Sequence, residues 1–236
     1  MAITGLCSSS QNLHQYSLCF TCSTFRPGSG KGMKMDIKSY LEQFGDDVCV
    51  DLVGPFARTS EPFHDPVIFV DGGTRLRRAG EGIAIGDGDS WSGDLDIRLD
   101  QQKDYSDLAF ALASLPRNTR LIHLSGFLGG RRDHELINLG EVYGFLQSRG
   151  HPTTARFDAE IIGYSPGAWE FDHDGVFSIA SFEETHVSIN GDCSYPLIEP
   201  TRVTPMSSLC LSNEAKGTIL ITCTESVFVF LGDHPS

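Results

Sequence analysis

The sequence has no long apolar run and little positive charge. A membrane helix needs about 20 consecutive apolar residues, and no run among the 236 residues reaches that length. Lys and Arg number 18 against 31 Asp and Glu, which gives a formal net charge of −13. Because nucleic acids are bound through basic patches that neutralise phosphates, we expect neither a membrane nor a nucleic acid as partner.

The seven cysteines also lack a regular framework, and their number is odd. We therefore expect reduced thiols in a cytoplasmic protein. The C-x-x-C pair Cys19 and Cys22 has no second Cys or His pair nearby to complete a zinc site. No internal repeat or low-complexity segment is present beyond the N-terminal tail.

Residues 1–34 contain no acidic residue and show no helical or strand periodicity. Gly28-Ser-Gly-Lys31 is similar to the end of a phosphate-binding P-loop, but Phe25 and Gly32 stand where that motif needs Gly and Ser or Thr. We interpret this segment as a disordered tail, a leader, or a non-native extension ahead of a start at Met33 or Met35.

Residues 35–155 have the pattern of an α/β domain. Short apolar runs that stop at Asp and Gly are typical of parallel strands with functional residues at their carboxyl ends. We predict a doubly wound, mostly parallel sheet. The expected strands are 48–53, 66–70, 82–85 and 121–124. The expected helices are 36–44 and 108–115, the second with Asp104 or Ser106 as N-cap. A third helix should run to about residue 148, with Leu136, Leu139, Val142 and Leu146 at helical spacing.

Residues 156–236 change to alternating apolar and polar positions separated by Asp, Gly and Asn turns. Runs of this kind are 176–182, 185–189 and 218–224. A period of two predicts antiparallel strands. We expect a C-terminal antiparallel β-sandwich domain that begins at about residue 156.

The stretch 124–134 organises the first half. An apolar run ends in a turn with Gly126, Gly129 and Gly130, and the turn opens a helix. Backbone N–H groups and the positive helix end can meet an anion there. Arg131 suits phosphate oxygens, and Asp133 suits a divalent metal. The alternative is a β-turn with a solvated, charged helix start.

Several aspartates stand at strand ends or helix starts: Asp71, Asp87, Asp89, Asp104, Asp107 and Asp133. In a doubly wound sheet these ends form one crevice. Crowded carboxylates there need a cation, and Mg²⁺ suits an oxygen site that also holds phosphates. Each aspartate by itself would more commonly have a turn or cap role.

Four motifs stand in an order that resembles the thiamine pyrophosphokinases: 86–90, 103–108, 129–139 and 208–214. The resemblance covers about residue 67 to the C-terminus. It implies an α/β catalytic domain, a β-sandwich and a homodimer with active sites between subunits. It also implies a Mg²⁺-dependent transfer of pyrophosphate from ATP to the hydroxyl of thiamine, with release of AMP.

The resemblance also suggests the site residues. The expected catalytic residues are Asp87, Asp89, Asp107, Arg131 and Asp133, and the four aspartates among them are the expected metal ligands. The expected nucleotide-binding residues are Asp71, Gly72, Gly73, Asp104, Ser106, Gly129, Gly130 and Arg131. The expected thiamine-binding residues are Ser208, Ser212 and Asn213.

Two departures concern the acceptor. Ser194 stands where members of the family often have Lys or Arg, and the aromatic residues near the C-terminus are Phe228 and Phe230 where some members have Trp. Three alternatives therefore stay open: transfer to another heterocyclic alcohol, phosphate hydrolysis by water, and a nucleotide- or thiamine-sensing module with little turnover.

Overall fold

The computed structural model describes residues 37–45, 49–58, 63–89 and 93–232, all within one compact unit. The interpretation of residues 1–34 therefore lies outside the described residues, as does Ser90 of the 86–90 motif. Within the described ranges, no helix has both the length and the apolar character that crossing a membrane requires.

The first half of the sheet is parallel. Its strands are β1 (Cys49–Val53), β2 (Val67–Val70), β3 (Ile83–Gly86), β4 (Ile97–Arg98), β5 (Leu121–Ser125) and β6 (Thr154–Phe157), in the order β6-β5-β1-β2-β3-β4. The apolar runs predicted as strands are confirmed as β1, β2, β3 and β5. β4 and β6 were not predicted, because β4 has two residues and β6 has no continuous apolar run.

Three α-helices accompany these strands: α1 (Ile37–Leu41), which continues as the 3₁₀ helix η1 (Glu42–Phe44), α2 (Asp107–Ser114) and α3 (Arg132–Gln147). Ser106 is the N-cap of α2, because its Oγ accepts a hydrogen bond from the backbone N–H of Ala109 at 2.9 Å. Val142 and Leu146 of α3 are buried as expected, whereas Leu136, directly after the first turn, is 50% exposed.

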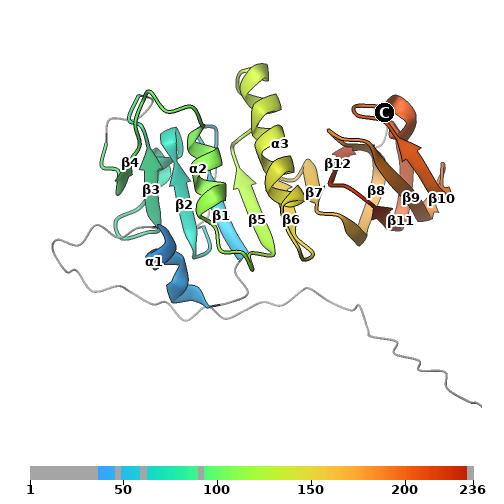
Figure 1. The fold of residues 1–236 in the computed structure, drawn as a ribbon, viewed down its shortest axis with the longest axis horizontal. Helices are drawn as coiled ribbons and strands as arrows, with labels where there is room; N and C mark the ends of the chain where they lie inside the picture. The colour runs from blue at the N-terminus through green and yellow to red at the C-terminus, as the bar shows by residue number, and fades with distance from the viewer. Residues whose placement is uncertain (1–36, 46–48, 59–62, 90–92, 233–236) are drawn as a thin grey trace, which may run out of the picture. The chain divides into compact units, whose positions relative to one another are not determined.

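The described α-helices cover only one face of the parallel strands. Side chains of all three α-helices share one core with Val50 and Leu52 of β1 and with alternate residues of β2, β3 and β5. In Figure 1, α2 and α3 lie on the same side of the parallel strands. The opposite face carries a smaller cluster around Phe69, packed by Leu76 of the 3₁₀ helix η2 (Asp71–Leu76) and by loop residues. The strand order runs outward from β1 in both directions, as in a doubly wound sheet, but no crossover among β1, β2, β3 and β4 contains a described α-helix.

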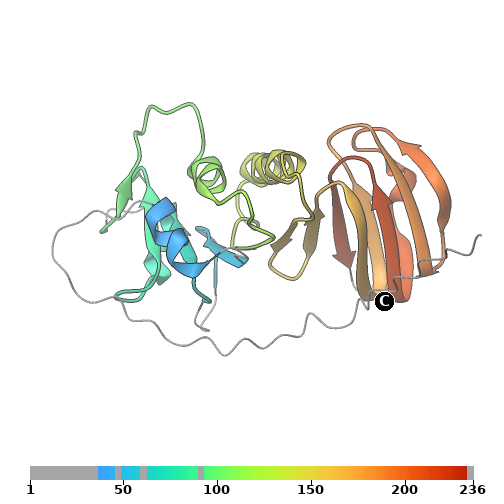
Figure 2. The ribbon, with the colours of Figure 1, turned by 60° about the horizontal axis from the view of Figure 1, so that its bottom comes forward.

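The second half of the sheet is antiparallel, as predicted. Its strands are β7 (Ile161–Tyr164), β8 (Gly167–Ala180), β9 (Thr185–Cys193), β10 (Leu197–Val203), β11 (Asn213–Cys223) and β12 (Val227–Gly232), with the 3₁₀ helix η3 (Ser208–Cys210) before β11. They curve around their own core, which includes Phe177, Ile179 and Ile221 (Figure 2).

Within the described residues, the two halves form a single hydrogen-bonded sheet of 12 strands. β6 makes the junction, because it pairs in parallel with β5 on one side and antiparallel with β7 on the other. Phe228 of β12 also packs into the core beneath the helices. A functional division at residues 155/156 remains a prediction.

Candidate functional site

Three aspartates meet at the carboxyl ends of β2 and β3. These strands are parallel neighbours, with Val70 opposite Ile85. Asp71 directly follows β2, and Asp87 and Asp89 follow β3; one carboxylate oxygen from each lies within 4.8 Å of the other two. We call these residues the acidic group. Asp87 and Asp89 were expected as metal ligands, but Asp71 was expected only among the nucleotide-binding residues.

The local backbone keeps the acidic group compact. Asp71 has a φ of 50°, in the left-handed region. A Cβ on Gly86 would lie 3.2 Å from the Cα of Asp71 and 3.5 Å from Oδ2 of Asp107. Asp87 Oδ1 also accepts a hydrogen bond from the backbone N–H of Asp89 at 3.1 Å. A glycine at position 86 therefore leaves room for acidic side chains from three different segments.

Lys103 joins Asp87 to the start of α2. Its Nζ lies 2.9 Å from Asp87 Oδ2 and 2.9 Å from Asp107 Oδ1, and its side chain is 7% exposed. Partial burial lowers the pKa of Lys103, but the hydrogen bonds to Asp87 and Asp107 outweigh burial and raise it. At Asp87 burial would raise the pKa, but the contacts with Lys103 and Asp89 together outweigh burial and lower the pKa of that carboxyl. Lys103 was not among the predicted site residues, although an i,i+4 pair with Asp107 is readable from the sequence.

The acidic group fits a magnesium ion. Oxygen ligands at about 2.0–2.1 Å in octahedral geometry lie about 3–4 Å apart, and one carboxylate oxygen from each residue of the group is already within 4.8 Å of the others. All three donors are hard oxygen ligands, as Mg²⁺ prefers. Lys103 offsets only part of the negative charge, because it also contacts Asp107.

The glycine loop before α3 is engaged by the chain's own carboxylates. The backbone N–H of Gly129 donates to Glu135 Oε1 at 2.6 Å. Glu135 Oε2 in turn pairs with Arg132 at 2.7 Å. Arg131 forms an ion pair with Asp133, and both side chains are largely exposed. The structure does not bring Asp133 into the acidic group, so its role as a metal ligand remains a prediction.

Other expected nucleotide contacts have packing roles. Gly72 and Gly73 are buried. A Cβ on Gly73 would lie 2.0 Å from the carbonyl oxygen of Val53, so only glycine fits there. Ser106 Oγ donates to Glu141 Oε2 of α3 at 2.6 Å and thereby links α2 to α3. Asp104 is exposed. Contact of these residues with a nucleotide remains a prediction.

The expected thiamine-binding residues lie around η3 and the start of β11. Ser208 and Ser212 are exposed. Asn213 is 3% exposed. Its Oδ1 accepts from the backbone N–H of Tyr195 at 2.9 Å, and its Nδ2 donates to the carbonyl oxygen of Tyr195 at 2.8 Å. The amide of Asn213 therefore fixes the segment before β10, and the exposed hydroxyls are freer to meet a ligand.

No known family model matches the chain, and no curated protein matches it in sequence. Solved structures do match. The thiamin pyrophosphokinase of Geobacillus thermodenitrificans is 25% identical with a TM-score of 0.61, over 79% of this chain and 98% of that one. The thiamine pyrophosphokinase of Bacillus subtilis is 21% identical with a TM-score of 0.56, over 79% and 100%.

A fungal structure extends the similarity. The thiamin pyrophosphokinase of Candida albicans is 11% identical with a TM-score of 0.58, over 82% of this chain and 90% of that one. These matches span nearly the full length of the solved proteins. The chain has a thiamine pyrophosphokinase-like fold.

Proposed function

We propose that the protein is a thiamine pyrophosphokinase, which transfers pyrophosphate from ATP to the hydroxyl of thiamine and releases AMP. The observation that carries the proposal is the acidic group at the carboxyl ends of β2 and β3. It lies where ligands bind in open α/β sheets, within a fold similar to those of thiamine pyrophosphokinases.

In this proposal Asp71, Asp87 and Asp89 hold Mg²⁺, and Asp107 supports the site through Lys103. Bound Mg²⁺ would supply charge neutralisation for the triphosphate. Reactions of this type depend mainly on positioning and electrostatic stabilisation. Asp87 or Asp89 would also accept the proton of the thiamine hydroxyl, which requires hydrogen-bond reach in the complex.

The loop before α3 would hold phosphate oxygens. The N–H of Gly129 donates to Glu135, so a phosphate oxygen would have to displace that carboxylate. Arg131 would exchange Asp133 for a phosphate. Both exchanges replace one anion by another at a helix N-terminus, where anions are stabilised. Gly130, Asp104 and Ser106 complete the proposed nucleotide contacts, and Asp133 would join the metal site only after leaving Arg131.

The acceptor would bind near Ser208 and Ser212. The chain's net charge of −13 suits the cationic thiazolium ring. Tyr195, Ile198, Leu209 and Leu211, which surround this region in sequence, are 53–71% exposed. We propose that a second copy of the chain covers these apolar side chains in a cytoplasmic homodimer.

A different acceptor is the second candidate. Phe228 is 1% exposed and packs against Tyr143 and Phe157, so it offers no face on which thiamine could stack. Phe230 is only partly exposed and packs against the same core. This favours a pyrophosphate transfer to another heterocyclic alcohol as the alternative reaction.

An assay with ATP, Mg²⁺ and thiamine that measures AMP tests the proposal. We expect AMP release that depends on thiamine and falls at least 100-fold in Asp89→Asn, with an unchanged circular dichroism spectrum. Asp94→Asn is the matched control, because Asp94 is exposed and outside the acidic group. AMP release without thiamine would indicate a hydrolase, and thiamine binding without AMP would indicate a sensor.

A further inference from the structure

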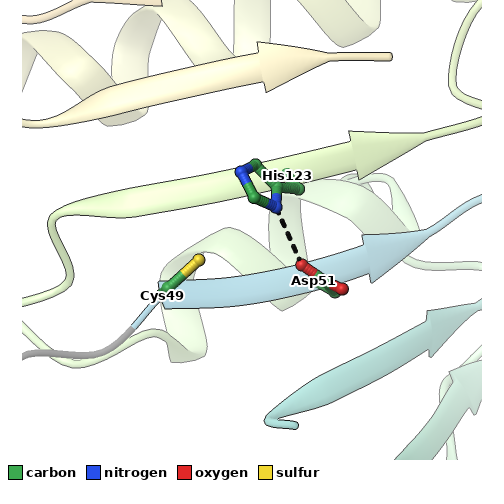
Figure 3. Close-up of side chains that lie close together, drawn as sticks. All are labelled: Cys49, Asp51 and His123. Atoms are coloured by element: carbon green, nitrogen blue, oxygen red, sulfur yellow. Dashed lines mark hydrogen bonds and ion pairs between the residues drawn. The ribbon is translucent and has the colours of Figure 1, made fainter. Parts of the chain in front are cut away.

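A second cluster of metal-binding side chains lies on the face of the sheet away from the α-helices. Cys49 and Asp51 are alternate residues of β1, so both point to the same face. The intervening Val50 belongs to the helix-covered core. His123 stands opposite Asp51 on the neighbouring strand β5. Figure 3 shows the three side chains gathered between these strands.

The donor atoms of Cys49, Asp51 and His123 all lie within 4.8 Å of one another. His123 Nδ1 is 3.1 Å from Asp51 Oδ1. Asp51 Oδ2 accepts a hydrogen bond from the backbone N–H of His64 at 2.9 Å, and the His64 imidazole Nδ1 lies 3.6 Å from the same oxygen. Asp51 therefore holds two imidazoles and the end of a loop around one carboxylate.

The chemistry of this donor set favours zinc over magnesium. Thiolate and imidazole are softer donors than the oxygens that Mg²⁺ requires. Around a tetrahedral zinc, sulfur, nitrogen and oxygen ligands lie about 3.3–3.6 Å apart. The present separations approach that arrangement, and the His64 side chain, which is 90% exposed, is free to turn.

A nucleophilic role for Cys49 is the competing interpretation. Within the described residues, His123 Nδ1 contacts Asp51 Oδ1 at 3.1 Å, and no hydrogen bond joins the imidazole to Cys49. A Cys–His catalytic pair requires the thiol and the imidazole within hydrogen-bond reach of each other. The arrangement therefore favours a shared metal over an activated thiolate.

We propose that Cys49, Asp51 and His123 form a zinc site that joins β1 to β5, with His64 as the fourth protein ligand. The site is independent of the proposed phosphotransfer. Cys49 opens β1, whereas the acidic group follows the carboxyl ends of β2 and β3, which run parallel to β1. A metal bound by the folded chain alone would also stabilise the fold.

Zinc titration of the full-length chain by calorimetry tests the proposal. Cys7, Cys19 and Cys22 are changed to serine throughout, so that N-terminal thiols cannot bind the metal. With Mg²⁺ in excess to occupy the acidic group, we expect one equivalent of Zn²⁺, with affinity at least 10-fold weaker in Cys49→Ser, His123→Gln and His64→Ala. Cys193→Ser, at a half-buried thiol on β9, and Asp89→Asn, in the acidic group, should bind Zn²⁺ like the parent.

Cobalt gives a second readout that does not depend on stability. Co²⁺ bound to the parent should show a thiolate-to-metal charge-transfer band, and Cys49→Ser should lose it while keeping the parent's circular dichroism spectrum. The proposal is overturned if the parent binds no zinc. It is equally overturned if Cys49→Ser and His123→Gln bind zinc as the parent does, or if Cys193→Ser loses it to the same extent.

Discussion

Lys103 is a basic residue at the centre of the candidate site that the sequence analysis did not include among the site residues. The aspartates of the first half were predicted as site residues because they stand at the ends of apolar runs. This pattern does not include basic residues such as Lys103. In the folded chain the Lys103 ammonium lies between Asp87 and Asp107. It therefore links the loop after β3 to the first turn of α2 without any bound ligand.

We predict that Lys103→Gln lowers the free energy of unfolding by about 2 kcal/mol, because two largely buried carboxylates lose their counter-charge. Urea denaturation of the two proteins measures the difference. Lys216→Gln is the control, because Lys216 is exposed on β11. Equal losses in the two variants would show that the contacts of Lys103 contribute nothing specific.

At the scale of elements, the sequence predicted those features that depend on short-range patterns in the chain. β1, β2, β3 and β5 are short, mostly apolar runs, and Ser106 is a common capping residue that stands directly before α2. The sequence predicted that Asp71 and Asp87 share one crevice, but it did not identify Asp71 as a metal ligand, because that depends on β2 and β3 being adjacent. The pairing of Arg131 with Asp133 depends on rotamers, which no spacing reveals.

Long-range strand pairing is also why the sequence pattern did not predict the single continuous sheet. Periodicity identified antiparallel strands after residue 160, but it cannot show that β6 carries a partner on each edge. It also cannot show which face a helix covers. The cluster of Cys49 with His123 is another case, because those residues are 74 positions apart and meet only through the register of β1 and β5.

The hydrogen bond from Ser106 to Glu141, which links α2 to α3, should make the stability of the protein depend on pH. Burial raises the pKa of Glu141, and the hydrogen bond from Ser106 only partly opposes the shift. Because the folded-state pKa lies above the unfolded value, folding takes up protons as the pH falls through that range. The contribution of Glu141 to stability therefore rises with falling pH and is lost above the folded-state pKa.

We predict that Glu141→Gln is more stable than the wild type at pH 7, because glutamine avoids the burial of a charge and still accepts from Ser106. The advantage should shrink as the pH falls through the Glu141 pKa. Unfolding free energies measured across this range test the sign, with exposed Glu170→Gln as the reference. If the unfolding free energy of the wild type rose relative to that of Glu141→Gln as the pH rises, the raised pKa of Glu141 would be contradicted.

At the scale of the whole molecule, the exposed apolar side chains around β10 and η3 predict self-association. Ile198 is 71% exposed on β10. We expect sedimentation to show a dimer that Ile198→Glu converts to a monomer, because the charge would be buried at the interface. Ile137→Glu, at a 57% exposed position on α3, should leave the dimer intact. A monomeric wild type would refute the proposed homodimer.

The central claim is that Asp71, Asp87 and Asp89 together hold a divalent cation. Mn²⁺ binding without nucleotide, followed by electron paramagnetic resonance as the loss of the free-ion signal, tests it most directly. We predict at least 10-fold weaker binding in Asp71→Asn and Asp89→Asn, and unchanged binding in Asp94→Asn. Mn²⁺ bound equally well by all four proteins would contradict it.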